Sequence, residues 1–337
     1  CDPRRASPRA PANPDPCSII AAMRRLAVIT PVFNDVACLP PFLRDLAQAA
    51  TDATQIDVFI VDDGSTEHLH LDTNDVPGPI TAIRILHLNC NLGHQRAIAV
   101  GLVEAVGHND YDAIVVIDAD GEDRPQDIAE LLAIHEQNPK AVVVAQRQTR
   151  QEAANFRFFY ALYKWLFRVL TGRRLDFGNF SVMSTSTARR MTLMTELWNH
   201  YPATVMRSHL PIVRVPIDRQ QRYAGQSRMN FTALVNHGLA AIAAFIDTAF
   251  ARLLVLAVAV TAIFGGLALA GVALRLTIGV PIPGWAALGA SVAMIGLIQI
   301  AAALVLLSFL TLSARSTASP PPARFASDYL AEVETVK

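Results

Sequence analysis

Charge is scarce in this 337-residue sequence, and it has no net sign. The 29 Lys and Arg residues balance the 29 Asp and Glu residues, and charged residues make up 17% of the chain, against roughly 25% in a typical soluble domain. The mean hydropathy is +0.31. These values exclude a disordered chain, a collagen-like fibre and a polybasic nucleic-acid-binding protein, so no nucleic-acid partner is expected.

Recognisable cysteine and glycine motifs are also missing. The four cysteines have neither a Cys-x-x-Cys pair nor the Cys/His spacing of a zinc site, which favours unpaired thiols of a reducing compartment over a disulfide framework. No Gly-x-Gly-x-x-Gly follows the first predicted strand, and no Gly-Lys-Ser/Thr occurs. Dinucleotide and P-loop sites therefore lose their main support.

Charge is nearly absent from one long segment, Leu253 to Leu312, whose sixty residues carry only Arg275. Leu253–Leu274 is an uncharged run of about 33 Å as a helix, enough to cross a hydrocarbon core of about 30 Å. After a segment with two prolines, Trp285–Leu312 is long enough to cross again with some tilt. Buried core helices seldom run this long without a charged face, so the pattern favours a two-helix membrane hairpin.

Two further segments have helical patterns suited to a membrane surface. Phe231–Arg252 is largely apolar and lies just before the first span, which predicts an interfacial helix. Phe156–Leu170 mixes aromatic and basic residues, and an interfacial helix and a plain surface helix packed on the sheet both remain open.

The predicted organisation follows from these segments. Residues 1–22 contain five prolines and no long apolar run, which predicts a disordered leader and not a signal peptide. Residues 23–230 form the catalytic domain, 231–252 the interfacial helix, 253–312 two transmembrane helices and 313–337 a tail. The basic residues around the hairpin favour cytoplasmic termini. An integral protein of a bacterial inner or plasma membrane is expected, with its catalytic domain also in the cytoplasm.

The zero net charge hides two opposed halves. Residues 26–139 contain 4 basic and 19 acidic residues, a net of −15, whereas residues 140–230 contain 15 basic and 4 acidic residues, a net of +11. Some of these charged residues are expected simply because they lie on a solvent-exposed surface. The acidic half suits a cation, and the basic half suits phosphates or anionic lipid.

Short apolar runs alternate with helical patterns along the acidic half. This alternation predicts an α/β fold with a mostly parallel sheet and helices on both faces, and such sheets bind ligands beyond the carboxyl ends of their strands. The predicted strands are Arg25–Thr30, Asp57–Val61, Ile83–Leu88, Ala113–Ile117 and Ala141–Ala145.

Polar turns follow three of these strands. Asp118-Ala119-Asp120 presents two carboxylates, the hard oxygen ligands that Mg²⁺ or Mn²⁺ prefers, and such a cation can bridge a diphosphate leaving group. A lone Asp-x-Asp is a weak signal. Here the turns Asp62–Thr66 and Pro31–Asp35 end neighbouring strands, so the three turns are expected to form one crevice.

At this point the sequence resembles a known family. The segments VITPVFND (28–35), VDDGST (61–66), NLGHQRAIAVGL (91–102) and DADGEDRP (118–125) are similar to successive motifs of family 2 glycosyltransferases. The closest likeness is to the branch of dolichol-phosphate mannose synthases and bactoprenol glucosyltransferases, in which a trailing hairpin also occurs. The resemblance implies a nucleotide-sugar-binding, GT-A-like fold, an inverting transfer from a UDP- or GDP-sugar, and Mg²⁺ or Mn²⁺ as cofactor.

The resemblance also implies roles for individual residues. Those implied to bind the donor are Pro31, Phe33, Asp35, Val61, Asp63, Asp118, Ala119 and Arg228. Those implied to hold the metal are Asp118, Asp120 and Glu122. The implied catalytic and phosphate-contacting residues are Asp120, Arg147, Arg222 and Asp176.

The acceptor is left open between two classes. A polyprenyl phosphate is already anionic and needs no strong base, whereas a glycan or lipid hydroxyl needs a carboxylate base, for which Asp176 is the first candidate and Asp123 the second. Asn179 stands where the family's Asp-x-Gly-Asp-Phe segment has a second acid. An inactive accessory protein is disfavoured because the carboxylates are present. A homo-oligomer is compatible with the sequence, and His94, His200 and His209 are interpreted as structural.

Overall fold

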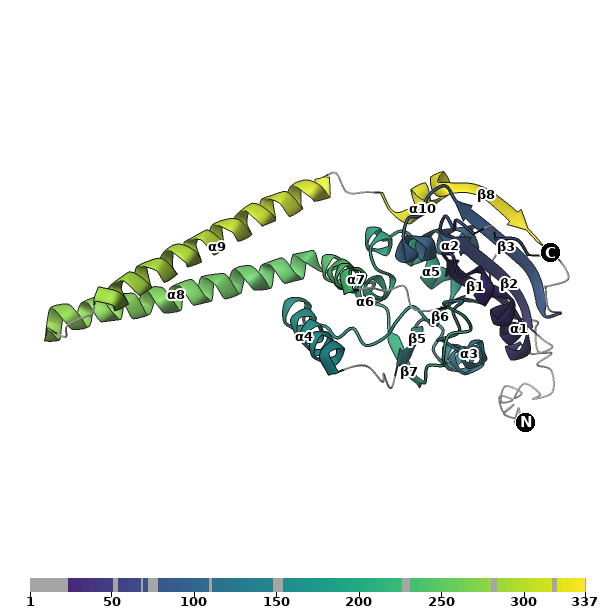
Figure 1. Ribbon diagram of the computed structural model, residues 1–337, viewed down its shortest axis with the longest axis horizontal. Helices are drawn as coiled ribbons and strands as arrows, with labels where there is room; N and C mark the ends of the chain where they lie inside the picture. The colour runs from purple at the N-terminus through teal and green to yellow at the C-terminus, as the bar shows by residue number, and fades with distance from the viewer. Residues whose placement is uncertain are drawn as a thin grey trace, which may run out of the picture.

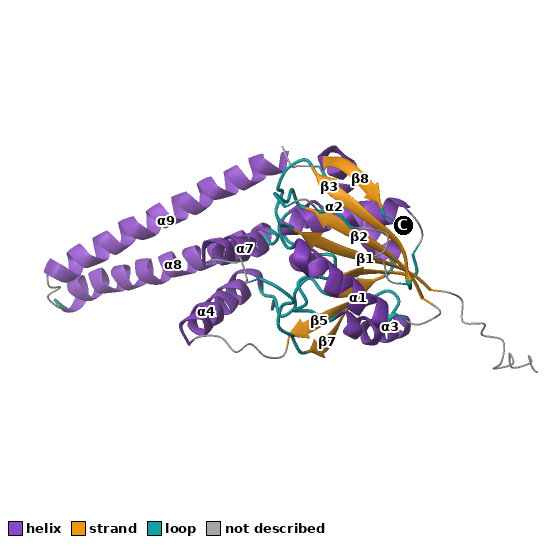
Figure 2. Cartoon of the chain, turned by 45° about the vertical axis from the view of Figure 1, so that its right-hand side comes forward, coloured by secondary structure: helices purple, strands orange, loops and turns teal. Residues whose placement is uncertain are grey.

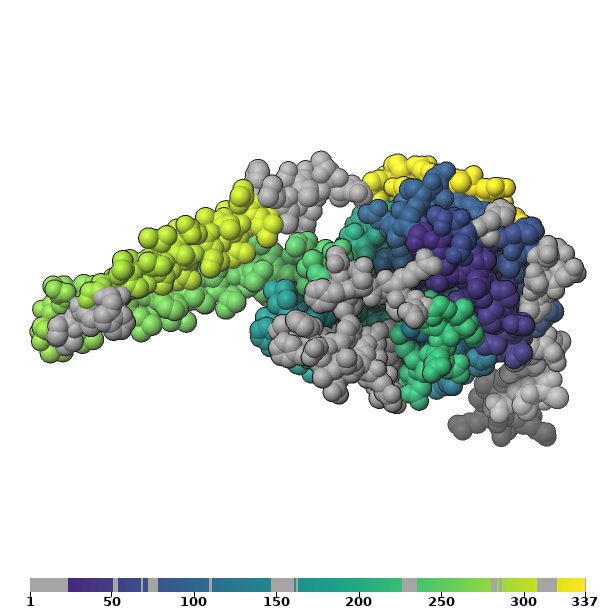
Figure 3. Space-filling view, in the orientation of Figure 1, coloured from purple at the N-terminus to yellow at the C-terminus, as the bar shows by residue number. Residues whose placement is uncertain are grey.

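The computed structural model describes residues 24–50, 54–67, 69–71, 78–108, 111–147, 154–225, 231–279, 284–316 and 320–336. A layered α/β domain carries a long helical hairpin that projects away from it (Figures 1 and 3). The predicted leader, residues 1–22, lies outside the described residues.

One mixed sheet of eight strands organises the domain, in the order β7-β5-β6-β4-β1-β2-β3-β8. Parallel pairs join β1 to β2 and β4, β2 to β3, and β5 to β7, whereas β6 and β8 run antiparallel to their neighbours. The strands are β1 (Arg24–Val32), β2 (Thr54–Asp62), β3 (Ile80–Leu88), β4 (Ala113–Val116), β5 (Val142–Arg147), β6 (Ser181–Met183), β7 (Ile212–Ile217) and β8 (Leu330–Thr335).

All five predicted strands are confirmed as β1 to β5, with ends within three residues of the prediction. Their continuous apolar runs arise because both faces of the sheet are buried. Ile29 and Val61 lie in the cluster on one face, and Val28 and Ile60 in the cluster on the other.

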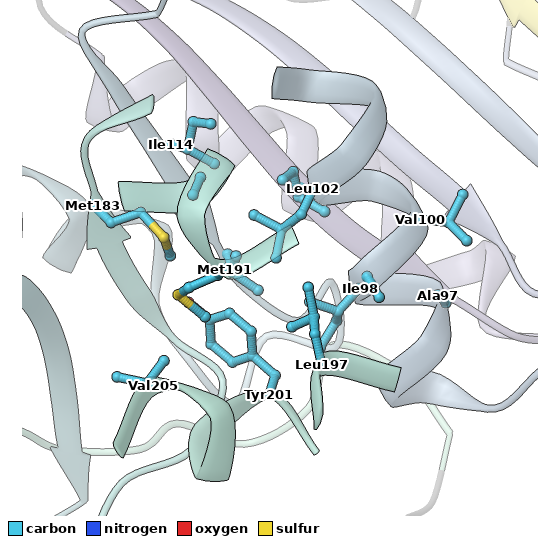
Figure 4. Close-up of a cluster of buried hydrophobic side chains, with 14 of the residues drawn as sticks. Ala97, Ile98, Val100, Leu102, Ile114, Met183, Met191, Leu197, Tyr201 and Val205 are labelled. Carbon is cyan, nitrogen blue, oxygen red and sulfur yellow. The ribbon is translucent and has the colours of Figure 1, made fainter. Parts of the chain in front are cut away.

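Helices cover both faces, as expected (Figure 2). Helices α1 (Leu39–Ala49) and α3 (Ile128–Gln137) bury their apolar side chains on one face. Helices α2 (His94–His108), α5 (Thr185–Thr192) and α6 (Tyr201–Arg207) cover the other, where α2 packs beside Tyr201 and Leu197 (Figure 4). Gly101 permits the close approach of α2, because a Cβ there would lie 2.6 Å from Cγ2 of Ile29.

Two helices, α8 (Ile246–Ile278) and α9 (Gly284–Ser316), form the hairpin and lie side by side (Figures 1 and 2). Both are long and apolar enough to cross a membrane: the 18-residue apolar window within Ile246–Ile278 has a mean hydropathy of 2.6, and that within Ala287–Leu307 has one of 2.4. Only 6% of the apolar window of α8 and none of that of α9 is buried. Their exposure argues against a pair of core helices.

A helix break lies inside the predicted interfacial segment, residues 231–252. Helix α7 (Phe231–Ala243) ends early, and α8 begins at Ile246, so residues 246–252 belong to the long helix. No proline or glycine separates Ile246 from the apolar run, and Asp247 lies in the first turn of α8, where a negative charge favours the helix N-terminus.

The tail returns to the domain, which the sequence did not predict. Helix α10 (Pro322–Phe325) and the short 3-10 helix η5 (Ala326–Tyr329) lead into β8, which pairs with the edge strand β3. The indole N–H of Trp198 donates to the carbonyl of Pro320 over 3.0 Å. Residues 320–336 are therefore held beside the sheet, on the domain side of the hairpin (Figure 1).

Candidate active site

The turns after β1 and β2 are bound together, as expected of one crevice. The side-chain carbonyl of Asn34 accepts from the backbone N–H of Thr66 over 2.7 Å, and the N–H of Asn34 donates to the Ser65 hydroxyl over 2.9 Å. The adjacent strand β4 is held in register because the N–H of Ile117 donates to the carbonyl of Ile29. The Asp118–Asp120 turn therefore starts at the same edge of the sheet.

The second carboxylate of this turn is buried against like charge. Burial raises the pKa of Asp120 to about 6, and the negative charge of Asp118 adds to the effect. The backbone N–H of Glu122 donates to Asp120 Oδ1 over 2.9 Å and partly opposes it. Such a pair of crowded carboxylates is a place where a cation stabilises the charged form.

A guanidinium occupies part of that position. Arg222 donates from Nη1 to Asp120 over 2.9 Å and from Nη2 to Asp35 over 3.1 Å, so it bridges the turns after β4 and β1. The loop that carries Arg222 therefore lies against these carboxylates.

Backbone and side-chain bonds hold this loop, residues 219–225, in place. The N–H of Tyr223 donates to the carbonyl of Asp120 over 2.9 Å, and the Tyr223 hydroxyl donates to Asp45 on α1 over 2.6 Å. Gly121, at φ +85°, passes directly under the Tyr223 ring. The loop is therefore docked on the Asp-x-Asp turn at several points.

Glu122, the third predicted ligand, forms an ion pair with Arg219. The buried Asp123 lies 3.8 Å from Arg219 Nε. Across the part of the chain that the structure describes, no three His, Cys, Asp or Glu side chains are gathered as a metal cluster.

Asp118 is held by residues that the sequence analysis did not assign to the site. His94 Nε2, at the first residue of α2, lies 3.2 Å from Asp118 Oδ1, and the Asn179 amide nitrogen lies 3.4 Å from the same oxygen. Desolvation lowers the pKa of His94, but the nearby carboxylates, Asp118 foremost, raise it more, so its pKa lies above its ordinary value. His94 lies inside the 91–102 motif, and its membership of that motif is the sequence feature that could have assigned it to the site.

Asp63 holds the loop before α2 by hydrogen bonds. It is buried, and its two oxygens accept from the N–H groups of Leu92 and Gly93 over 2.7 and 2.9 Å. Burial raises the pKa of Asp63, and these two hydrogen bonds partly offset the shift. The carboxylate thereby fixes the loop that begins α2.

The chain matches one known family over the region that carries the three turns and the start of α2. Residues 27–198, about half of the chain, match the family described as Glycosyl transferase family 2. The chain belongs to glycosyltransferase family 2. It is a glycosyltransferase that uses a nucleotide-sugar donor, and its sheet and helices have the GT-A-like arrangement.

Solved structures of glucosyl-3-phosphoglycerate synthase from Mycobacterium tuberculosis show a low level of similarity to this chain. Its complex with Mn²⁺, UDP-glucose and phosphoglyceric acid has 14% identity and a TM-score of 0.47, covering 67% of this chain and 80% of that one. Its complex with Mn²⁺, UDP and glucosyl-3-phosphoglycerate has 14% identity and a TM-score of 0.45, with the same coverages. The branch of the family, and with it the acceptor, stays a prediction.

The remaining residues predicted to bind the donor differ in how far they are exposed. Pro31 pairs with Val61 in the β1–β2 ladder, Val61 is buried in the core, and Phe33 is 38% exposed. Ala119 is buried between the two carboxylates. Beside the second turn, a cavity of about 310 Å³ is lined by Asp62, Gly64, Ser65, Thr66, Glu67, Leu69, His87 and Leu88.

The predicted base, Asp176, and Arg147 lie toward the far half of the sheet. Asp176 accepts from Gln146 Nε2 on β5 over 2.9 Å and from Arg214 Nε on β7 over 3.1 Å. Arg147 is the last residue of β5, and Arg228 lies outside the described residues.

Proposed function

We propose that this family 2 glycosyltransferase is a membrane-anchored inverting enzyme that transfers a sugar from a UDP- or GDP-sugar to a polyprenyl phosphate at the cytoplasmic face of the membrane. The observation that carries the proposal is the attachment of an exposed apolar hairpin directly to the domain that holds the crevice. Such an attachment brings a lipid-linked acceptor and a nucleotide-sugar donor to the same enzyme.

Two arginines fix the hairpin to the domain. Arg207 on α6 donates to the carbonyl of Ala244 and to Asp247, each over 3.0 Å, at the junction of α7 and α8. Arg252 on α8 donates to the carbonyl of Val169 over 2.9 Å, near the C-terminal end of α4 (Ala154–Thr171), where a positive charge is favoured. These contacts support a fixed distance between the membrane and the crevice.

Helix α4 favours the interfacial interpretation over a helix packed on the sheet. It contacts α7 and α8, and Trp165 is 61% exposed beside the exposed Leu166 and Val169, with Arg168 exposed as well. Exposed Trp and aliphatic side chains next to basic residues are typical of helices that lie at the headgroup level of a bilayer.

Asp118 and Asp120 are the proposed ligands of a Mg²⁺ or Mn²⁺ ion, with Glu122 as a third. The fit rests on the Arg222 guanidinium bound between Asp35 and Asp120, and on the raised pKa of Asp120, which both indicate a position suited to positive charge. When bound, the ion supplies charge stabilisation to the diphosphate leaving group.

The residues of the chain then act by positioning and by charge. The acceptor phosphate oxygen forms a bond to the anomeric carbon as the bond from that carbon to the donor diphosphate breaks, and a nucleoside diphosphate leaves. Arg222, with Arg147 and Arg228, is proposed to contact the phosphates, and Pro31, Phe33, Asp35, Val61, Asp63 and Ala119 to form the donor-binding wall.

Asp176 bears on the choice of acceptor. Both of its oxygens accept hydrogen bonds, one from a guanidinium, so the carboxylate is already engaged by donors. This favours an acceptor that needs no base. Transfer to a glycan or lipid hydroxyl, with Asp176 or Asp123 as base, is the second candidate, because Asp176 follows closely in the chain after α4, the proposed interfacial helix.

Donor binding tests the proposed site. Purified full-length protein is titrated with UDP- and GDP-sugars, with and without Mn²⁺, and compared with the Asp120→Asn variant. Glu130→Gln, which removes one exposed acidic charge on α3, is the matched control. The proposal expects metal-dependent binding of at least one donor that is lost in Asp120→Asn and kept in the control. Metal-independent binding that survives in Asp120→Asn would count against it.

A further inference from the structure

A chain of hydrogen bonds runs from the protein core to Asp118. The backbone N–H of Tyr201 donates to Gln95 Oε1 over 2.6 Å, and Gln95 Nε2 donates to Asn179 Oδ1 over 3.2 Å. Asn179 Nδ2 in turn lies 2.9 Å from His94 Nε2 and 3.4 Å from Asp118 Oδ1. The chain joins α6, α2 and the loop before β6 to the carboxylate.

The directions of the bonds from Tyr201 through Gln95 and Asn179 to Asp118 are set by the first member. A backbone N–H can only donate, so the Gln95 atom that faces Tyr201 must be the carbonyl oxygen. The Gln95 NH₂ group therefore faces Asn179, and the Asn179 atom that accepts from it must also be its carbonyl oxygen. The Asn179 NH₂ group is then turned toward Asp118, to which it donates.

The first member is fixed in place. Tyr201 is fully buried, and its hydroxyl lies 2.5 Å from the hydroxyl of Ser181 on β6. The N-cap of α6, His200, accepts from the N–H of Ala203 over 3.2 Å. Asn179 is itself only 9% exposed. The chain thus starts from the packed core and not from a mobile surface.

We infer that Gln95 and Asn179 are positioning residues that hold Asp118 in one orientation for the divalent cation. The amide of Asn179 is suited to this role because it donates to the carboxylate, whereas an aspartate at the same place would bring a second negative charge to within about the same distance. This inference rests on the proposed function, which makes Asp118 a metal ligand. Partners that hold a ligating carboxylate typically change metal affinity by 10–100-fold when they are removed.

Two substitutions at Gln95 distinguish the effect of its hydrogen bonds from the effect of its packing. Gln95→Glu keeps the shape of the side chain and its bond to Tyr201, but it replaces the NH₂ donor with an acceptor, so Asn179 is expected to turn its own NH₂ away from Asp118. Gln95→Met keeps a similar volume and removes both bonds, which leaves Asn179 without an imposed orientation. Gln126→Glu, exposed on the 3-10 helix η3 (Pro125–Asp127), adds the same charge to the acidic half and is the control.

The test measures Mn²⁺ binding to the full chain by electron paramagnetic resonance, without donor, together with the melting temperature. The inference expects Gln95→Glu to weaken Mn²⁺ binding by about tenfold or more, and more than Gln95→Met does, although Gln95→Met lowers the melting temperature more. If Gln95 has a purely structural role, the variant with the lower melting temperature, Gln95→Met, should also be the one with the weaker Mn²⁺ binding. Mn²⁺ affinity in Gln95→Glu equal to or above that of the wild type overturns the inference.

Two further variants show whether a negative result overturns only the positioning role of Gln95 and Asn179 or the proposed metal site as well. Asp118→Asn and Asp120→Asn are expected to abolish Mn²⁺ binding. If they abolish it while Gln95→Glu binds like the wild type, only the positioning inference is overturned. If they leave Mn²⁺ binding unchanged, the proposed metal site itself is wrong.

Discussion

Gly121→Ala tests whether the 219–225 loop is docked through the Asp-x-Asp turn. Gly121 has φ +85°, a region that costs other residues about 1–2 kcal/mol. A Cβ at this position would lie 2.6 Å from Cδ2 and Cε2 of the Tyr223 ring, about 1 Å closer than a carbon–carbon contact allows. The ring must withdraw, and its hydroxyl then loses Asp45, a hydrogen bond to a charged group worth about 1.5–3 kcal/mol.

The expected outcome is a loop that opens more readily. A docking loss of about 2 kcal/mol corresponds to roughly a 30-fold change in the opening equilibrium. Hydrogen exchange should report it at the N–H groups of Gln220 and Tyr223, which donate to the carbonyls of Glu122 and Asp120. Both amides should exchange about 30-fold faster in the variant, if exchange follows the opening equilibrium.

A matched substitution controls for the added methyl group. Gly107 lies in α2, and a Cβ there would meet no side chain and no backbone outside its own helix within 4 Å. Gly107→Ala should therefore stabilise the helix by up to about 1 kcal/mol and leave exchange in the loop unchanged. Exchange at Gln220 and Tyr223 within twofold of the wild type in Gly121→Ala would refute the reasoning.

Three other predictions concern stability and donor binding. Burial, with His237 beside it, lowers the pKa of His200 to about 3, so the folded state stays neutral while the unfolded state gains a proton. The contribution of His200 to stability should therefore fall by about 1.4 kcal/mol per pH unit between pH 6.5 and about 3, and His200→Asn, which keeps an N-cap, should lose this contribution; equal slopes of stability against pH for the wild type and the variant in thermal melts would contradict this. Arg222→Lys should weaken donor binding about tenfold in titrations, because an ammonium cannot span Asp35 and Asp120 as the guanidinium does; wild-type affinity would argue against the bridge. Removing residues 320–337 should lower the unfolding free energy by a few kcal/mol in denaturant titrations, because the edge of β3 loses its partner; an unchanged midpoint would contradict a structural role for β8.

The sequence predicted the parts of the site that depend on local pattern. The turns at Pro31–Asp35, Asp62–Thr66 and Asp118–Asp120 follow apolar runs that could only be buried strands, and parallel strands bring their ends to one edge. That rule needs no knowledge of side-chain packing. The structure confirms the five strands and joins the first two turns by hydrogen bonds.

The parts that the sequence did not predict depend on contacts between distant residues. Gln95 and Asn179 are 84 residues apart, and neither has a feature that marks it as a partner of the other. Strand β8 (LAEVET) alternates apolar and acidic residues too weakly to stand out, and it becomes a strand because β3 offers an unpaired edge.

Formation of a lipid-linked sugar tests the central proposal most directly. The full-length protein in lipid nanodiscs is supplied with radiolabelled UDP- or GDP-sugars, undecaprenyl or dolichyl phosphate and Mn²⁺ or Mg²⁺, with Asp120→Asn and Glu130→Gln run in parallel. The account predicts label that extracts into organic solvent, is released by mild acid as expected of a sugar phosphoester, and is absent with Asp120→Asn. Labelled product that is stable to mild acid, or no lipid product from protein that binds the donor, would contradict it.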